Sequence, residues 1–315
     1  MKKNLLIIGL LALTITACNN QANTSSSGEP DISTLSIISP TGAPALAFYD
    51  FAKGDNFITN NDPTNIVAMM NAGQKDIIVL PTNAGVGNIN KGAPYKLAAT
   101  ITFGNFYVAS LNNDDNGVMD ENDVILLFQQ NNVPDKLFHY VYGNDLNNAI
   151  HYVGAVNDVA VAVRDQEFED NKIKYTPNYV LTAEPSLTSL IAQYGVTKYA
   201  DIQAEYRKKS NNSEMFQASV FIKNDVGEDK GNAFLNKLKA DIEAALSDSN
   251  KLLEGMNKVE GAQGLFGVPP QVAANVLKAN NGMGLGFKMA KENKAAIDKF
   301  LSIFNIPETN EKIYY

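Results

Sequence analysis

Apolar residues in this chain fall into short runs, each followed by a polar turn and then by apolar positions at helical spacing. The first unit has its apolar run at residues 35–38, its turn at residues 39–43 and helical spacing over residues 44–49. A short apolar run that leads into a helical period is typical of a buried strand followed by a helix. Pro44 suits the first turn of a helix, because the N–H that proline lacks has no partner there. The pattern therefore predicts an α/β fold.

The same unit recurs along the chain, with Thr, Asn, Gln or Glu in its turns. Further strands are predicted at residues 77–80, 95–102, 124–128 and 179–181, and helices at residues 134–142 and 186–194. Backbone N–H groups at a strand-to-helix turn lie at the positive end of the helix dipole and can dock a small polar or anionic ligand. Such a turn can equally be a plain connection of an α/β domain.

The N-terminal 34 residues resemble an export signal and a tether. A basic start and an apolar run over residues 5–13 lead through small residues to Cys18, as in a bacterial lipoprotein signal with its lipobox. The run is shorter than the roughly 20 apolar residues of a membrane-spanning helix. The resemblance implies that residues 1–17 are the signal peptide, that Cys18 is lipidated, and that residues 18–34 are a flexible tether. It implies a protein anchored by its lipid on the extracytoplasmic face of the cell membrane.

The chain is long enough for one or two hydrophobic cores. It has 315 residues and is 45% hydrophobic, which favours two lobes. Loss of the signal leaves 24 basic against 34 acidic residues, a net charge of −10 that disfavours nucleic acid and broad anionic-lipid contact. Cys18 is the only cysteine, so the folded part has no disulfide, thiol nucleophile or cysteine metal cluster. Arg164 and Arg207 are the only arginines, so a guanidinium clamp on a carboxylate is not expected.

Residues 112–123 carry oxygen-bearing side chains at loop positions one, three, five, nine and twelve and glycine at position six. That spacing resembles a calcium loop of the EF-hand or dockerin type, with Val118 as a carbonyl ligand. Two positions depart from it, because asparagine replaces the first carboxylate and aspartate the final glutamate. A solvated hairpin turn is the alternative. The side-chain ligands would be Asn112, Asp114, Asn116, Asp120 and Asp123.

Five segments stand in the order found in the type II periplasmic binding proteins. They are SPTGAPALAFYDFA, MMNAGQKDIIVLPTNAG, FGNFYVAS, LLFQQNNVPDKLFHYV and YVLTAEPSLTSLI. The chain is most similar to the substrate-binding subunits of ABC importers for nitrate, aliphatic sulfonates, taurine and thiamine-precursor pyrimidines. This resemblance implies two α/β lobes joined by two crossing strands, with a ligand cleft between the lobes. It implies no cofactor.

The resemblance also divides the chain and names its partners. Residues 35–110 and 216–315 form the first lobe, residues 111–215 form the second, and residues 216–223 are the second crossing strand. The expected protein is a monomer that captures a small solute and delivers it to an ABC permease and its ATPase. Polar turns without an arginine clamp favour a neutral or heterocyclic solute over a strongly charged anion, although backbone amides can hold sulfonate or nitrate.

For a solute-binding protein, the candidate ligand-binding residues are those of the polar turns. Glu184 can accept a bond from the ligand or serve as an acid at a helix start, and the two readings are evenly weighted. Phe103, Phe106 and Phe128 can stack on a flat ring or belong to the core. The candidates are Thr41, Gly42, Ala43, Thr82, Asn83, Gly104 and Asn105 from the first lobe and its crossing, and Gln130, Asn131, Asn132 and Glu184 from the second lobe.

Two other classes of function are weaker. His139 and His151 are the only histidines, both lie in apolar contexts, and the sequence has no G-x-S-x-G, P-loop or H-E-x-x-H motif, so catalysis is not expected. An enzyme on the same fold, the thiamine-pyrimidine synthase, has a cysteine-rich iron motif that this chain lacks. A surface adhesion or assembly lipoprotein is the other alternative, with residues 112–123 as its docking loop.

Overall fold

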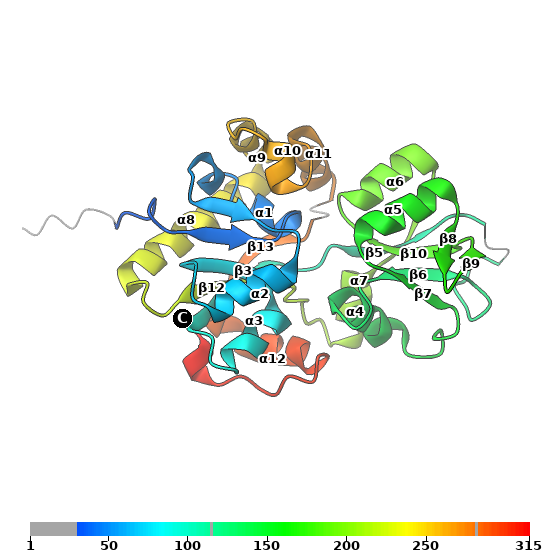
Figure 1. Ribbon diagram of the computed structural model, residues 1–315, viewed down its shortest axis with the longest axis horizontal. Coiled ribbons are helices and arrows are strands. Elements are labelled where there is room, and N and C mark those ends of the chain that lie inside the picture. Colours follow the sequence, from blue (N-terminus) through cyan, green and yellow to red (C-terminus); the bar gives the residue numbers. More distant parts are fainter. Residues whose placement is uncertain (1–29, 114–115, 281–282) are drawn as a thin grey trace, which may run out of the picture.

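The computed structural model describes residues 30–113, 116–280 and 283–315, and it has two lobes side by side (Figure 1). The signal peptide, Cys18 and most of the tether lie outside this part of the chain. None of the helices in the described ranges is long and apolar enough to cross a membrane.

The first lobe is built on a six-stranded mixed sheet. Its strands lie in the order β13, β4, β12, β3, β1, β2. Alternate residues of β3 pack on opposite faces: Ile77 and Val79 on one, Ile78 and Leu80 on the other. The sheet is therefore covered by apolar helices on both sides, as the continuous apolar run predicts. The strands are β13 (Leu285–Met289), β4 (Tyr95–Thr102), β12 (Ala218–Lys223), β3 (Ile77–Pro81), β1 (Ile37–Ser39) and β2 (Phe57–Thr59).

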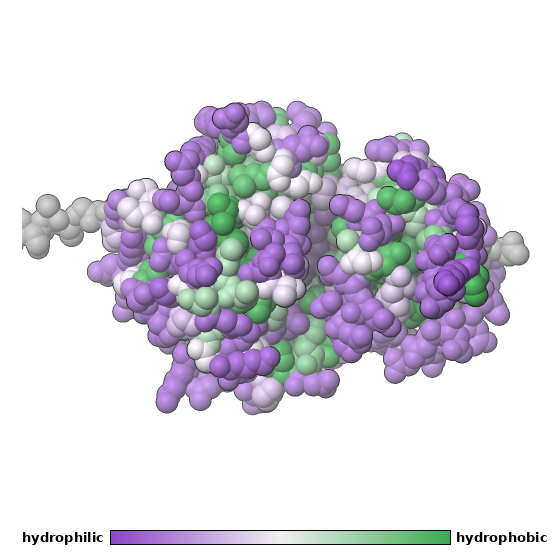
Figure 2. Space-filling view, in the orientation of Figure 1, coloured by the Kyte–Doolittle hydropathy of each residue, from purple (hydrophilic) through white to green (hydrophobic). Residues whose placement is uncertain are grey.

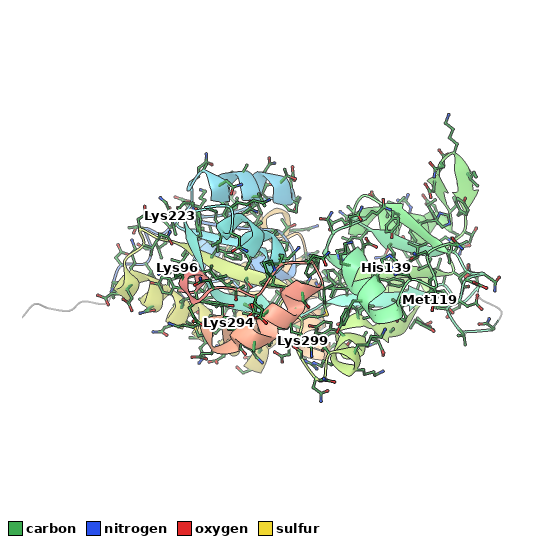
Figure 3. All side chains as sticks on the ribbon, turned by 90° about the horizontal axis from the view of Figure 1, so that it is seen from below. Lys96, Met119, His139, Lys223, Lys294 and Lys299 are labelled. Atoms are coloured by element: carbon green, nitrogen blue, oxygen red, sulfur yellow. The ribbon has the colours of Figure 1, made fainter. Side chains whose placement is uncertain are left out.

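Two groups of helices cover this sheet, one on each face. One group is α1 (Ala43–Leu46), α8 (Glu228–Ser247), α9 (Ser249–Met256), α10 (Ala262–Phe266) and α11 (Pro270–Asn280). The other is α2 (Pro63–Asn71), α3 (Thr82–Ile89) and α12 (Lys294–Ser302). Short 3-10 helices lie at Phe51–Lys53, Lys291–Asn293 and Glu311–Ile313. Figure 3 shows Lys294 and Lys299 of α12 on the first lobe and His139 on the second.

The second lobe is built on a five-stranded sheet in the order β11, β5, β10, β6, β7. Its strands are β11 (Thr197–Asp201), β5 (Phe106–Ser110), β10 (Tyr179–Ala183), β6 (Ile125–Phe128) and β7 (Ile150–Val153). Its helices are α4 (Val133–Tyr142), α5 (Val156–Asp165), α6 (Ser186–Tyr194) and α7 (Ile202–Lys209). A separate hairpin joins β8 (Phe168–Asp170) and β9 (Ile173–Tyr175).

One boundary differs from the sequence prediction. Residues 106–110 are predicted in the first lobe, but β5 lies in the second sheet, where it pairs with β10 and β11. The chain therefore leaves the first lobe at residues 103–105, directly after β4. It returns through residues 210–217, between α7 and β12.

Candidate functional site

The strand ends that carry the predicted turns lie at facing edges of the two sheets. In the first lobe, the carboxyl ends of β1 and β3 lie at the same edge as the start of β12. In the second lobe, the carboxyl ends of β6, β7 and β10 meet the start of β5. Because the two connecting segments are short and join these edges, the edges face each other. Figure 2 shows a furrow between the lobes.

A chain of side-chain amides joins the two connecting segments to β10. Asn105 Nδ2 donates to the backbone carbonyl oxygen of Glu184 at 3.3 Å, and Gln217 Nε2 donates to Asn105 Oδ1 at 3.0 Å. The Glu184 carbonyl can only accept, so it fixes the orientation of Asn105, and Asn105 fixes that of Gln217. The remaining acceptor, Gln217 Oε1, is buried and has no hydrogen-bond partner among the described residues.

Hydroxyl groups of the first lobe lie next to this chain of amides. Ser219 Oγ lies 2.7 Å from Thr82 Oγ1 and 2.8 Å from Thr100 Oγ1, and the Thr82 N–H donates to the Gln217 carbonyl oxygen. Thr102 Oγ1 and Asn83 Oδ1 are buried, and neither has a hydrogen-bond partner in the described ranges. These groups lie at the start of α3, where β3, β12 and β4 end or begin. The site therefore holds several buried hydroxyl and amide groups close together, three of whose oxygens have no partner in the described residues.

The turn after β1 is more constrained than the sequence suggests. Gly42 has a φ of 84°, and its N–H donates to the Phe266 carbonyl oxygen at 2.9 Å. The Gly42 N–H is therefore not one of the free backbone amides that the sequence predicts for this turn. Thr41 Oγ1 bonds to Asn61 in the turn after β2, and Ala43 is buried at the start of α1. With four residues, α1 is too short to provide a strong helix dipole.

The turn after β6 carries three of the candidate ligand-binding residues of the second lobe. Gln130, Asn131 and Asn132 are exposed. The Asn131 N–H donates to Asp135 Oδ2 at 2.7 Å, and the Asn132 N–H donates to the Gln129 carbonyl oxygen at 3.0 Å. These bonds are local, and they fix the shape of the turn rather than join it to the first lobe.

Glu184 has a structural role at the start of α6. Its side chain is buried, and its two carboxylate oxygens accept bonds from the Thr188 N–H at 3.0 Å and the Thr188 hydroxyl at 2.9 Å. Glu184 therefore has the second of its two predicted roles, that of an acidic residue at the start of a helix. The backbone of Glu184 also exchanges two hydrogen bonds with Asn105. It therefore helps to hold the crossing segment against β10.

Gly104 lies within the first crossing at a φ of 103°, where other parts of the chain approach it closely. A Cβ on Gly104 would lie 2.8 Å from Gln203 Oε1, and one on Gly284 would lie 2.1 Å from the Gly104 carbonyl oxygen. A cavity of about 370 Å³ opens beside this crossing, between β13 of the first lobe and α7 of the second. Charged groups at its wall are paired, with Lys288 Nζ 2.5 Å and Arg207 Nη2 3.7 Å from Glu214.

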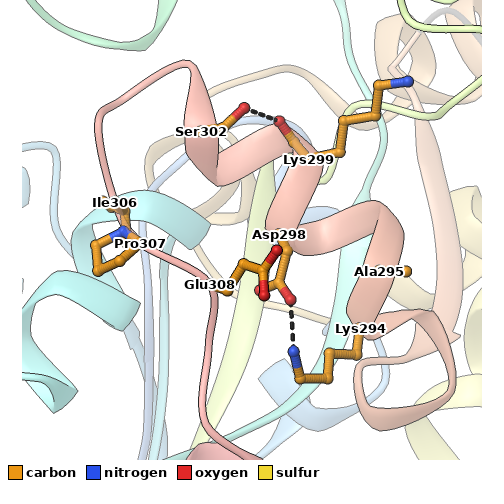
Figure 4. A pocket seen from close by; sticks show the side chains of 8 residues that line it. All are labelled: Lys294, Ala295, Asp298, Lys299, Ser302, Ile306, Pro307 and Glu308. Carbon is orange, nitrogen blue, oxygen red and sulfur yellow. Dashed lines mark hydrogen bonds and ion pairs between the residues drawn. The ribbon is translucent and has the colours of Figure 1, made fainter.

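A second cavity, of about 540 Å³, lies outside the furrow, against α12 (Figure 4). Its charged groups bond to one another: Lys294 Nζ lies 2.6 Å from Asp298 Oδ2. Asp298 Oδ1 accepts the Thr309 N–H and hydroxyl, which ties the C-terminal segment to α12. This cavity is therefore a structural junction.

The described residues of the loop at 112–123 bond both to one another and to neighbouring segments, and the Asn112 side chain bonds to Gly195 and Thr197. The Val118 N–H donates to Asn116 Oδ1 at 2.6 Å, and the Asp120 N–H donates to Asp123 Oδ2 at 2.7 Å. Among the residues that the structure describes, no group of three His, Cys, Asp or Glu is arranged to hold a metal. Asp114 lies outside those residues, so calcium binding stays a prediction.

Several of the predicted residues are thus brought together, and others in the site are new. Asn105 and Glu184 bond to each other, Thr82 and Asn83 lie beside them, and Gly104 shapes the crossing. Gln217 was not predicted, although it stands within a strand that was. The residues that the sequence missed are Thr100, Thr102, Gln217 and Ser219.

Solved structures of binding proteins share this architecture over most of their length. An ABC transporter protein of Parabacteroides distasonis matches at a TM-score of 0.68 with 18% identity, covering 86% of this chain and 91% of that one. The zinc-bound ligand-binding component of an ABC-type import system of Staphylococcus aureus matches at 0.61 with 11% identity, covering 89% and 95%. This chain has the type II periplasmic-binding-protein fold.

The alkanesulfonate-binding protein of Xanthomonas axonopodis pv. citri, bound to MOPS, has the same periplasmic-binding-protein fold. It matches at a TM-score of 0.58 with 9% identity, covering 92% of this chain and 96% of that chain. The sequence itself matches no protein-family model and no curated protein. At these identities the comparisons establish the fold, and the function and the solute have to be argued from the site.

Proposed function

We propose that this protein is the lipid-anchored binding subunit of an ABC importer and that its solute is a small neutral molecule rich in hydrogen-bond donors. The observation that carries the proposal is Gln217 Oε1, a buried acceptor whose orientation is fixed from a backbone carbonyl. Asn83 Oδ1 is a second acceptor without a partner in the described part of the chain. Acceptors repel an anion and attract N–H or O–H groups.

The surroundings of the acceptors support the same class of solute. The amides and hydroxyls around the acceptors are neutral, and Arg207, in the wall of the cavity between β13 and α7, is paired with Glu214. Glu184 is the nearby charged side chain that the bonds identify, and it is acidic. A carboxylate beside a solute also disfavours an anion. We therefore expect sugars, amides and heterocycles with N–H groups to bind better than sulfonates or nitrate.

The two histidines support binding rather than catalysis. His139 bonds to the Gly143 carbonyl oxygen and lies against Asp135, while His151 bonds to Asp170 and stacks near Tyr175. Both are therefore part of local structural networks. Lipid attachment at Cys18, and a permease with its ATPase as partners, complete the proposal.

Thermal unfolding in the presence of candidate solutes tests this function. A ligand that binds the native state raises its melting temperature by mass action. We expect a rise with a donor-rich neutral solute and none with sulfonates or nitrate. A rise with sulfonates alone would overturn the solute class, and no rise across a broad panel would overturn the binding function.

Substitution of Gln217 then tests the site. Gln217→Met removes the acceptor for the solute, together with the Gln217 bond to Asn105. Loss of one neutral hydrogen bond to the solute should lower affinity about 2- to 13-fold, which corresponds to about 0.5–1.5 kcal/mol. Gln193→Met is the matched control, because Gln193 is exposed on α6. Calorimetric titration of both variants measures the change. Equal affinities in the two variants would place the solute elsewhere.

A further inference from the structure

The cavity between β13 and α7 has walls from both lobes and lies to one side of the acceptor at the start of α3. One row of paired residues crosses the first sheet from β13 through β4 and β12 to β3: Leu285, Thr102, Ala218 and Pro81. Three strand spacings amount to about 14 Å. Leu285 lines the cavity, whereas Pro81 directly precedes α3, which carries Asn83. The strands β4 and β12 therefore stand between the cavity and the start of α3.

Gln203 lines this cavity from the first turn of α7, and its amide has no partner. The residue is 9% exposed. Neither Nε2 nor Oε1 has a hydrogen-bond partner among the residues that the structure describes. The backbone N–H of Gln203 donates to Asp201 Oδ1 at 2.9 Å, which holds the residue at the start of the helix. A buried amide without partners is unfavourable, because both of its polar groups have given up water.

The first crossing is shaped to bring this amide close. A Cβ on Gly104 would lie 2.8 Å from Gln203 Oε1 and 3.2 Å from the Gln203 Cβ, so Gln203 packs against a residue without a side chain. The neighbouring N–H of Phe103 already donates to the Gly284 carbonyl oxygen at 2.7 Å. That N–H is therefore not available to the Gln203 amide.

The cavity wall also has aromatic rings and paired charges. Phe103 and Phe287 both line the cavity. Lys288 Nζ lies 2.5 Å and Arg207 Nη2 lies 3.7 Å from the carboxylate of Glu214. A charged ligand would have to disturb these pairs, whereas a neutral one would not. The two basic side chains are about half exposed, so they can turn to admit a ligand to the deeper part of the wall.

We propose that this cavity is a second binding site, for a small, flat, neutral molecule that carries a carbonyl and an N–H side by side on one edge, as a carboxamide or a lactam does. The carbonyl accepts from Gln203 Nε2 and the N–H donates to Gln203 Oε1, so one ligand satisfies both groups. The ring of the ligand packs against Phe103 and Phe287. A cavity of about 370 Å³ is within the size range of small-molecule sites. The inference does not rest on the proposed function, because it uses neither Gln217 nor Asn83.

Nuclear magnetic resonance with benzamide as the probe tests this site. Benzamide has the proposed edge on a flat ring, and acetophenone has a similar shape without the N–H groups. The side-chain amide signals of Gln203 and Gln217 are assigned by their loss in Gln203→Met and Gln217→Met. We expect benzamide to move the Gln203 signal in the wild type and, with the same affinity, in Gln217→Met. Acetophenone should bind about 2- to 13-fold more weakly, because it lacks one neutral hydrogen bond.

Gln203→Met removes both hydrogen bonds to the ligand. We expect the dissociation constant of benzamide, followed at the Gly286 backbone amide in the cavity wall, to rise about 5- to 150-fold. An unchanged dissociation constant in this variant would overturn the proposal. Movement of the Gln217 signal without the Gln203 signal would place benzamide in the furrow and would also overturn it. No movement of either signal, or equal affinity for acetophenone, would overturn the proposed class of ligand.

Thermal unfolding without any ligand tests the unpartnered amide itself. Methionine has nearly the shape of glutamine but neither the donor nor the acceptor, so Gln203→Met should raise the melting temperature. Gln193→Met, on the exposed side of α6, is the matched control and should leave it unchanged. A lower melting temperature in Gln203→Met, or failure of this variant to fold, would show that the amide has partners in the native protein. Either result would overturn the proposal.

Discussion

A buried side-chain carbonyl without a donor costs about 1–3 kcal/mol. Gln217 Oε1 is such a group, and the bonds from Glu184 through Asn105 prevent it from turning away. A solute that donates to it recovers this free energy on binding. The same argument disfavours an anionic solute, because an anion would bring a further acceptor to an acceptor.

Asp298 provides a test of stability at the residue scale. Burial raises the pKa of its carboxyl, but the bonds from Lys294 and Thr309 outweigh burial and lower the pKa overall. The stabilisation is therefore present above the pKa of the unfolded chain, near 3.9, and is lost as the pH falls through the folded value. Asp298→Asn should lower the free energy of unfolding at neutral pH by about 1–2 kcal/mol, after partial solvent screening.

Urea unfolding of the wild type and Asp298→Asn at several pH values measures this difference. We expect it to shrink as the pH is lowered below about 4. Asp165→Asn is the control, because that carboxylate pairs with Arg164 on the surface. A difference that persists in acid would show that Asp298 stabilises through shape rather than charge.

At the residue scale, the sequence predicted which turns form the candidate site, but it did not predict which side chains in the site bond to each other. Asn105 and Glu184 were candidates, and the structure bonds them to each other. Gln217 was read as part of a strand, because periodicity assigns a residue to an element but does not say which side chain it meets. In the structure it stands just before β12, where its side chain bonds to Asn105 of the other connecting segment.

Among the elements, α3 sets the position of Thr82 and Asn83, and it does so through close packing. A Cβ on Gly85 would lie 2.0 Å from the ring of Phe221, which is fully buried in β12. Gly85→Ala should therefore lower the free energy of unfolding by about 1–3 kcal/mol through overpacking. Gly87→Ala is the matched control in the same helix.

A Cβ on Gly87 meets no atom within 4 Å, so Gly87→Ala should raise the free energy of unfolding by about 0.4–1 kcal/mol. Denaturant unfolding of the two variants gives both numbers. Opposite signs are expected, and a destabilised Gly87→Ala would contradict the packing of α3.

Elements with one clear period were predictable, and those defined by distant pairing were not. Residues 77–80 and 186–194 were predicted as a strand and a helix, and they form β3 and α6. The strands β8 and β9 form a hairpin around residues 171–172, and it was not among the predicted elements. The prediction that residues 106–110 belong to the first lobe was wrong, because the apolar pattern of a strand does not indicate which sheet the strand joins.

On the scale of the whole molecule, the two lobes are joined by a narrow junction. Residues 103–105 and 210–217 join them, and the Phe103 N–H donates to the Gly284 carbonyl oxygen at 2.7 Å. Lys288 and Arg207 come from different lobes and both lie near Glu214 of the second connection. A hinge at this junction would change the width of the furrow. The order of the segments in the sequence predicted this architecture, although it did not predict the paired charges.

A crystal structure of the protein saturated with a solute that raises its melting temperature tests the central claim most directly. We predict a solute between the two lobes, with an N–H or O–H group about 2.7–3.2 Å from Gln217 Oε1. A solute bound in the cavity against α12, or one that presents an anionic group to Gln217, would contradict the account.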